Sequence, residues 1–185
     1  GVTHETALNY SVGFRGPNGR DLISSFADYV LENDLGGEHY SDPDLTCREH
    51  PGRVEEYELE RLRNMMIDMI RQPEDFKQWF GSFVTTPRHE LDIAPAEPAY
   101  EEAEVVDALL GGEKLSRLSG LRVLHIGDSF FVHSEQLDTT DAGALDALCR
   151  YTSLGQEELG SGLKNPAFVS ELTRLINQGY WYFEE

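Results

Sequence analysis

Two strand-like runs meet at a glycine turn in Leu121-Arg122-Val123-Leu124-His125-Ile126-Gly127-Asp128-Ser129-Phe130-Phe131-Val132-His133. Branched and aromatic residues on both sides of a Gly-Asp dipeptide are typical of a β-hairpin. We therefore expect strands over 121–126 and 130–133. A further strand is expected over 114–118, separated from the hairpin by a turn at Ser119-Gly120.

Helices are expected on both sides of this hairpin. Apolar residues recur at helical spacing over 105–110, 144–151, 157–162 and 166–178. Asn165 suits the N-cap position of the last helix, because its side-chain oxygen can accept from free backbone N–H groups there. The apolar end, Tyr180 to Phe183, predicts a last strand. These short helices and the hairpin form a small α+β module that resembles a winged helix-turn-helix.

A proline-rich stretch separates this module from the residues before it. Residues 87–98 contain Pro87, Pro95 and Pro98, several acidic side chains and little apolar periodicity. This composition is typical of a linker. We therefore place the start of the small module near Tyr100.

Two amphipathic helices are expected before the linker. Apolar residues at helical spacing run from Leu59 to Ile70 in the first, and Pro73 suits the first turn of the second. The second helix carries an aromatic stripe of Phe76, Trp79, Phe80 and Phe83. Such a stripe usually packs in a core. Trp79, Phe80 and Phe83 are also candidates for a seam between two copies of the chain.

The chain opens on an alternating segment, Ala7 to Phe14. Its bulky apolar face and its small polar face, with Asn9 and Ser11, predict a strand. The polar face either meets solvent or lines a ligand pocket, where Asn9 and Ser11 would offer hydrogen bonds. Residues from Leu22 to Leu31 then predict a helix, and 38–52 a long loop. Because a lone strand needs a sheet, we expect the chain to be the carboxyl-terminal part of a larger protein.

The composition is that of a globular and strongly acidic protein. Of 185 residues, 39% are hydrophobic and 26% are charged, and 34 acidic against 15 basic residues give a formal net charge of -19. No window holds the roughly 18 apolar residues of a membrane-spanning helix. The charge disfavours nucleic-acid binding and favours basic partners, unless it serves only solubility. Cys47 and Cys149 form no disulfide or zinc pattern, which fits a reducing cytosol.

The sequence motifs provide no complete active site. His133-Ser134-Glu135 has the spacing of part of a two-histidine, one-carboxylate iron site, but we expect an exposed loop histidine there. His89-Glu90-Leu91-Asp92 lacks the second histidine of a zinc-protease helix. The sequence has no nucleophile elbow, Walker loop or dinucleotide fingerprint. We therefore assign no catalytic residue and no metal ligand to these residues.

The sequence resembles the bacterial ribosomal oxygenases along nearly its whole length. The similarity is carried by Asn9-Tyr10-Ser11-Val12-Gly13-Phe14-Arg15, Phe26-Ala27-Asp28-Tyr29-Val30-Leu31, Tyr40-Ser41-Asp42-Pro43-Asp44, Phe76-Lys77-Gln78-Trp79-Phe80-Gly81, Arg88-His89-Glu90-Leu91-Asp92-Ile93-Ala94-Pro95 and Gly179-Tyr180-Trp181-Tyr182-Phe183-Glu184. Members of this family are JmjC-type cupin enzymes that use Fe(II), 2-oxoglutarate and oxygen to hydroxylate an arginine of a large-subunit ribosomal protein. The resemblance implies an α+β chain in four parts. These are the terminal strand of a double-stranded β-helix over 1–20, a helical dimerisation region over 21–86, a Pro-rich linker over 87–99 and a winged-helix-like domain over 100–185.

The resemblance also implies where the chemistry lies. The iron ligands of the family fall before Gly1, so the chain alone is expected to be inactive and to bind neither Fe(II) nor 2-oxoglutarate tightly. Asn9 and Ser11 would face the cofactor pocket, and Ile23 would pack against the substrate arginine. The expected assembly is a cytoplasmic homodimer that acts on a basic ribosomal protein and binds neither nucleic acid nor membranes.

Two other functions stay open. A non-enzymatic interaction module would dimerise through the aromatic stripe and bind protein with its winged-helix fold. A transcription regulator would need a basic recognition helix, yet 166–178 offers only Arg174, with Lys164 just before it. The acidic charge therefore ranks the regulator last.

Overall fold

The computed structural model describes residues 16–43, 45–50, 52–138 and 141–184. The chain divides into two compact units, Gly1–Asp44 and Leu45–Glu185. Within the described ranges, no helix has both the length and the apolar character needed to cross a membrane.

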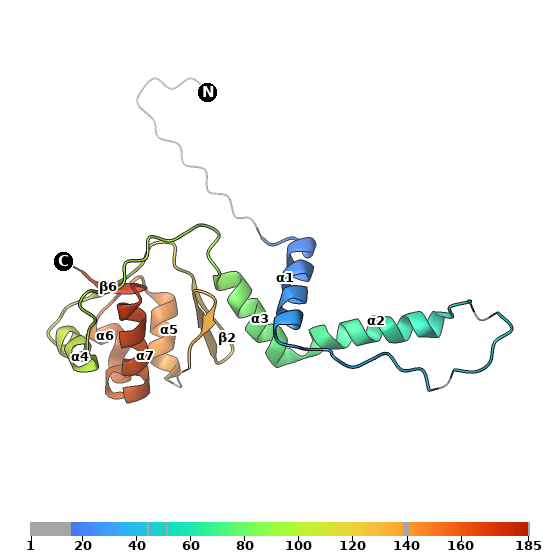
Figure 1. Ribbon diagram of the computed structural model, residues 1–185. Coiled ribbons are helices and arrows are strands. Elements are labelled where there is room, and N and C mark those ends of the chain that lie inside the picture. Colours follow the sequence, from blue (N-terminus) through green and yellow to red (C-terminus); the bar gives the residue numbers. More distant parts are fainter. Residues whose placement is uncertain (1–15, 44, 51, 139–140, 185) are drawn as a thin grey trace, which may run out of the picture. The chain divides into compact units, whose positions relative to one another are not determined.

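In the first unit the described residues form the helix α1 (Gly19–Glu32), shown in blue in Figure 1. Asn18 caps its start, because the side-chain oxygen accepts from the N–H groups of Arg20 and Asp21 at 2.9 and 3.1 Å. The helix expected from Leu22 to Leu31 is thereby confirmed. The expected strand over 7–14 lies outside the described residues.

The second unit begins with a loop and two consecutive helices, α2 (Glu56–Arg71) and α3 (Pro73–Thr85). Pro73 occupies the first position of α3, where its missing N–H would have no helical partner in any case. Arg48 holds the loop on α2, since its guanidinium donates to both carboxylate oxygens of Glu58 at 2.7 and 2.8 Å. Both expected helices are confirmed.

Two small antiparallel sheets follow. The first has the order β5–β1–β6 and consists of β1 (Leu115–Arg117), β5 (Ser153–Leu154) and β6 (Trp181–Phe183). The second has the order β2–β3–β4 and consists of β2 (Val123–Ile126), β3 (Ser129–Val132) and β4 (Glu135–Gln136). The expected hairpin is β2–β3, with Leu124 opposite Phe131. The turn at Ser119-Gly120 lies between the two sheets, and the two-residue strands β4 and β5 were missed by the sequence pattern.

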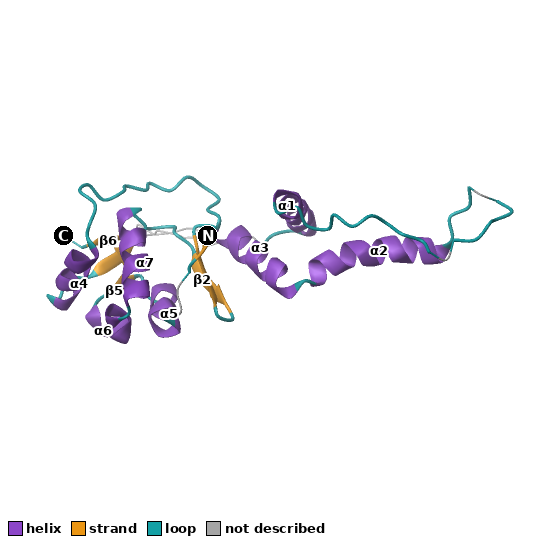
Figure 2. Cartoon of the chain, turned by 60° about the horizontal axis from the view of Figure 1, so that its bottom comes forward, coloured by secondary structure: helices purple, strands orange, loops and turns teal. Residues whose placement is uncertain are grey.

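Helices complete this body. They are α4 (Glu102–Leu110), α5 (Ala142–Arg150), α6 (Gln156–Leu159), a 3-10 helix (Gly160–Lys164) and α7 (Pro166–Asn177), most of which are visible in purple in Figure 2. Asn165 caps α7 as expected and accepts from the N–H of Ala167 at 3.1 Å. One apolar core joins helices and sheets, with Leu109, Leu172 and Trp181 fully buried in it. The mixed helices and small sheets confirm the expected α+β class.

Helix α3 packs against the β2–β3–β4 sheet, as Figures 1 and 2 both show. Gly81 is buried at this contact, and a Cβ at that position would overlap the ring of Phe131. The hydroxyl of Thr85 accepts from the backbone N–H of Ser134 at 3.0 Å, and Arg122 donates to a main-chain carbonyl of α3 at 3.0 Å. Helix α3 therefore belongs to the same packed body as the sheets.

The segment 91–100, which we name the strap, contains neither helix nor strand. Leu91 and Ile93 pack against the apolar core. The N–H of Ala96 donates to the carbonyl of Asn177, at the end of α7, at 3.1 Å. The strap has the composition of a linker. These contacts nevertheless attach it to the body that contains α7 and the apolar core.

Candidate functional site

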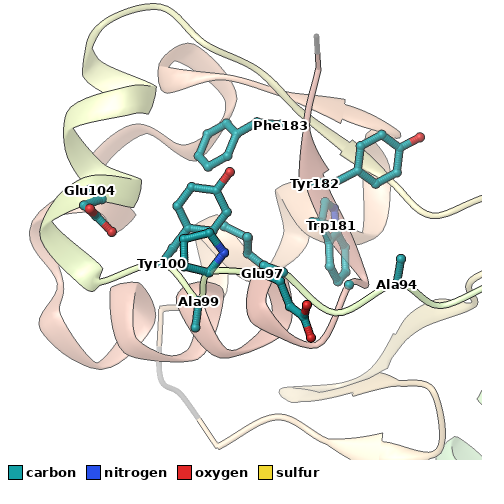
Figure 3. Close-up of a pocket in the computed structure, with 12 residues that line it drawn as sticks. Ala94, Glu97, Ala99, Tyr100, Glu104, Trp181, Tyr182 and Phe183 are labelled. Atoms are coloured by element: carbon teal, nitrogen blue, oxygen red, sulfur yellow. The ribbon is translucent and has the colours of Figure 1, made fainter.

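A groove of about 370 Å³ lies between the strap and β6. The strap contributes Ala94, Glu97, Pro98 and Tyr100, and β6 contributes Trp181, Tyr182 and Phe183. Figure 3 shows the rings of Tyr100 and Phe183 next to each other, with their centres 5.4 Å apart. Glu104 of α4 also lines the groove. The walls are therefore aromatic and carry carboxylates at Glu97 and Glu104.

The strap is held in place by two residues near the end of α7. The side-chain amide of Asn177 accepts from the N–H of Tyr100 at 2.8 Å and donates to its carbonyl at 3.0 Å. Gly179 has a φ of 81° and lies so close to Ala94 that a Cβ would overlap the carbonyl of that residue. Only glycine adopts this conformation at little cost while allowing such an approach. The groove is thus bounded by a fixed wall.

The other wall is the edge strand β6, whose backbone groups alternate between two sides. The carbonyl of Tyr180 and the N–H of Glu184 bond to the β1 segment at 3.0 and 2.9 Å. Because antiparallel pairing uses every second residue, Tyr182 also faces β1. The N–H and C=O groups of Trp181 and Phe183 therefore point to the opposite side. No strand pairs with that side among the described residues.

A carboxylate anchors the end of β6 across the sheet. Glu184 accepts from the hydroxyl of Ser116 at 2.6 Å and from that of Ser153 at 2.7 Å. These hydrogen bonds lower the pKa of the Glu184 carboxyl. The contact joins all three strands of the sheet at the end of β6, next to the groove.

The residues singled out from the sequence lie elsewhere. Asn9 and Ser11 are outside the described residues. Ile23 lies on α1 with 73% of its side chain exposed. Trp79 is buried, with 4% exposed, whereas Phe80 and Phe83 are half-buried, with ring centres 6.0 and 5.6 Å from that of Trp79. The three aromatic residues form one cluster on α3, but the structure does not test their assigned role at a seam.

His133 departs from its expectation as an exposed loop residue. It is half-buried, and its ring centre lies 5.0 Å from that of Tyr180. The reason is the tight turn after β3, where His133 and Ser134 have φ angles of 48° and 71° and the chain reverses toward β4. Its Nδ1 atom is buried and has no hydrogen-bond partner among the described residues. The ring therefore packs against the body.

Sequence reasoning did not find the groove. Its walls come from the strap and from β6, which are separated by about 80 residues of sequence and are brought together by contacts such as those of Asn177 with Tyr100 and of Tyr100 with Phe183. The available signal was the aromatic run from Tyr180 to Phe183, which predicts a strand but not its free edge. That the backbone N–H and C=O groups of Trp181 and Phe183 point away from β1 is known only from the pairing register.

Comparison with known proteins gives a consistent set of matches. Residues 68–182 match the family model described as ROXA-like winged helix. The ribosomal protein uL16 3-hydroxylase of Escherichia coli strain K12 is 54% identical over 184 residues, which are 100% of this chain and 49% of that protein. The crystal structure of the Escherichia coli ribosomal oxygenase YcfD matches with a TM-score of 0.90 at 54% identity, over 94% of this chain and 48% of the other.

A second structure of YcfD, in complex with cobalt and 2-oxoglutarate, matches with a TM-score of 0.89 at 53% identity, again over 94% of this chain and 48% of that chain. The matched part of YcfD is its carboxyl-terminal half. The chain thus spans about half the length of the curated relative that it matches.

Proposed function

The chain belongs to the family of ROXA-like winged-helix proteins, and we propose that it is part of an Fe(II)- and 2-oxoglutarate-dependent oxygenase that hydroxylates an arginine of a large-subunit ribosomal protein. The observation that carries this proposal is the 54% identity, along the whole chain, to a protein named ribosomal protein uL16 3-hydroxylase. The complex of YcfD with cobalt and 2-oxoglutarate supports the metal and the co-substrate, with cobalt in the place of Fe(II).

The described residues do not fit the iron centre itself. Within them, no three His, Cys, Asp or Glu side chains lie close enough together to hold a metal ion. We place the iron ligands outside these 185 residues, as the resemblance implies, and we expect the chain alone not to turn over 2-oxoglutarate. When bound in the whole protein, Fe(II) and 2-oxoglutarate would supply the oxidising chemistry together with molecular oxygen as the oxidant.

We propose that residues of this chain line the edge of the active site. Asn9 and Ser11 are proposed to line the cofactor pocket, where their side chains would offer hydrogen bonds. Ile23 is proposed to pack against the aliphatic part of the substrate arginine. Its 73% exposure on α1 leaves the side chain available for such a contact.

A homodimer is the proposed assembly, with Trp79, Phe80 and Phe83 near its seam. Because Trp79 is buried in the single chain, its role there would be to support the two half-buried rings beside it. Helix α2 adds an apolar stripe in which Leu62 is 44% and Met66 is 66% exposed. Burial of these side chains by a second copy would remove apolar surface from water.

The net charge of -19 supports the substrate class. An acidic protein attracts a basic ribosomal protein over long range and repels nucleic acid. We propose the cytoplasm as the place of action, because ribosomal proteins are found there. The salt dependence of substrate binding tests the attraction by charge, because steering by charge weakens as ionic strength rises.

The test uses a longer protein that contains this chain and the residues that precede it in its relatives. With Fe(II), 2-oxoglutarate and a peptide of the ribosomal protein, we expect one added oxygen on an arginine, detected by mass spectrometry. In that protein, Ile23→Ala should lower kcat/KM about tenfold, and Ile23→Val much less. Absence of arginine hydroxylation would refute the proposal. Succinate production by the 185-residue chain alone would refute the assignment of the iron ligands.

A non-enzymatic interaction module remains the second candidate, and the exposed stripe on α2 favours it. That module would self-associate through α2 without any 2-oxoglutarate chemistry in the longer protein. Sedimentation of the chain and of its Met66→Glu variant tests the association. The hydroxylation assay then separates an enzyme that dimerises from a module that only dimerises.

A further inference from the structure

The free edge of β6 offers an unused set of backbone hydrogen-bonding groups. The N–H and C=O groups of Trp181 and Phe183 point away from β1, as the bonds of Tyr180 and Glu184 to the β1 segment require. Strands with such edges pair with an added strand unless something blocks them. Here the strap lies opposite the edge, but none of its described residues makes a backbone hydrogen bond to Trp181 or Phe183, and a groove of about 370 Å³ separates them.

The groove has the lining of a site for an extended chain. Its strap wall is fixed by Asn177 and Gly179, so the groove does not need to form when a ligand arrives. Aromatic rings from Tyr100 and Phe183 provide apolar contact surface for the side chains of such a ligand. Main-chain bonds then give affinity, and the rings and carboxylates give preference among side chains.

The charges of the groove select the ligand. Glu97 and Glu104 line it, and none of the described residues that line it is basic. The whole chain carries a net charge of -19, so an acidic segment would be repelled and a basic one attracted. The rings of Tyr100 and Phe183 also suit a guanidinium group, which stacks on aromatic faces.

From these observations we infer that the groove between the strap and β6 binds an extended basic peptide segment, which adds a strand to the free edge of β6. Trp181 has no exposed surface, so the backbone groups of the segment bond to the N–H and C=O of Phe183, which is half-buried, and an arginine or lysine side chain reaches Glu97. Only the origin of the segment rests on the proposed function: a basic ribosomal protein substrate would supply it, as a second point of attachment.

The experiment follows the backbone amides of the isotope-labelled 185-residue chain by NMR. The probe is a capped peptide of alternating arginine and valine, added at low salt. We expect hydrogen exchange at the Phe183 amide to slow about tenfold at saturation, because the amide becomes bonded. The Tyr182 amide is already directed at β1, so its exchange serves as the internal reference and should change little.

Two control peptides and two variants separate the contributions of backbone pairing and of charge. A peptide of the same sequence with N-methyl groups on the bonding side cannot form the ladder and should not bind. An alternating glutamate and valine peptide tests the charge and should not bind either. Glu97→Lys should weaken binding of the arginine peptide about three- to tenfold, whereas Glu90→Lys, an equal charge change on an exposed residue before the strap, should have little effect.

Specific results would overturn the inference. Equal binding of the N-methylated peptide would exclude strand addition, and equal binding of the glutamate peptide would exclude selection by charge. If the Phe183 amide were protected without peptide, and more so at higher protein concentration, a second copy would occupy the edge instead. None of these outcomes depends on hydroxylation. The peptide-binding proposal and the oxygenase proposal are therefore tested independently of each other.

Discussion

The contact between α3 and the β2–β3–β4 sheet can be tested by changing both of its sides. Gly81→Ala adds a Cβ that would overlap the ring of Phe131, a side chain with no exposed surface. Overpacking of a close contact costs about 1–3 kcal/mol. Alanine in place of glycine stabilises a helix by about 1 kcal/mol, which offsets part of this cost. We therefore expect Gly81→Ala to lower the free energy of unfolding by up to about 2 kcal/mol.

The second change, Phe131→Leu, makes room for the added methyl group. Alone it should lower the free energy of unfolding by about 1–2 kcal/mol, because it leaves a small cavity. In this background Gly81→Ala no longer overlaps a ring, and only its gain in helix stability remains. The double variant should therefore be more stable than the sum of the single changes predicts, by about 1–3 kcal/mol.

Urea unfolding followed by far-ultraviolet circular dichroism gives the four free energies, provided that the slope with urea is the same in all variants. Gly143→Ala in α5 is the matched control, since among the described residues its Cβ would meet only Asp141, at an ordinary distance of 3.7 Å. That change should leave stability the same or raise it. Additivity of Gly81→Ala and Phe131→Leu within about 0.5 kcal/mol would refute the close packing of α3 on the sheet.

Other predictions use the same unfolding measurements. Thr85→Val removes the acceptor of the Ser134 N–H and should cost about 1–3 kcal/mol; Thr85→Ser, which keeps the hydroxyl, should cost less. The bonds from Arg48 lower the pKa of Glu58 from 4.5 to about 2, so their stabilisation is present above the ordinary pKa and is lost as the pH falls toward 2. Urea midpoints should therefore drop on acidification more in the native chain than in Glu58→Gln, and equal drops would contradict the pairing. Gly179→Ala should cost about 1–3 kcal/mol, because it combines a positive φ with an overlap of the strap, and it should speed amide exchange in 94–100; unchanged exchange there would contradict this role of Gly179.

The local elements followed from short-range patterns. The cap at Asn165, Pro73 at the start of α3 and the Gly-Asp turn of the β2–β3 hairpin each act within a few residues, so the sequence contains the whole cause. The strands β4 and β5 were missed because a two-residue strand has no period of its own and exists only by pairing.

The placement of α3 and of the strap needed the tertiary structure. The aromatic stripe on α3 drew attention to Trp79, Phe80 and Phe83, while its contact with the sheet runs through Gly81, which has no side chain to recognise in a pattern. The strap has the prolines and acids of a linker, yet the amide of Asn177 fixes it at Tyr100. Neither contact has a local signature.

By itself the sequence determined the α+β class, most helices and strands, the acidic charge and, through specific motifs, the resemblance to ribosomal oxygenases. Those properties depend on residue types and on spacings of a few residues. Only the tertiary structure decided that β1 pairs with β5 and β6 rather than with β2, and that β6 therefore has a free edge. Pairing between distant strands is chosen by the packing of the whole core, in which Trp181 and Leu115 are fully buried. The groove beside β6 is a consequence of that choice, which is why no stretch of sequence predicted it.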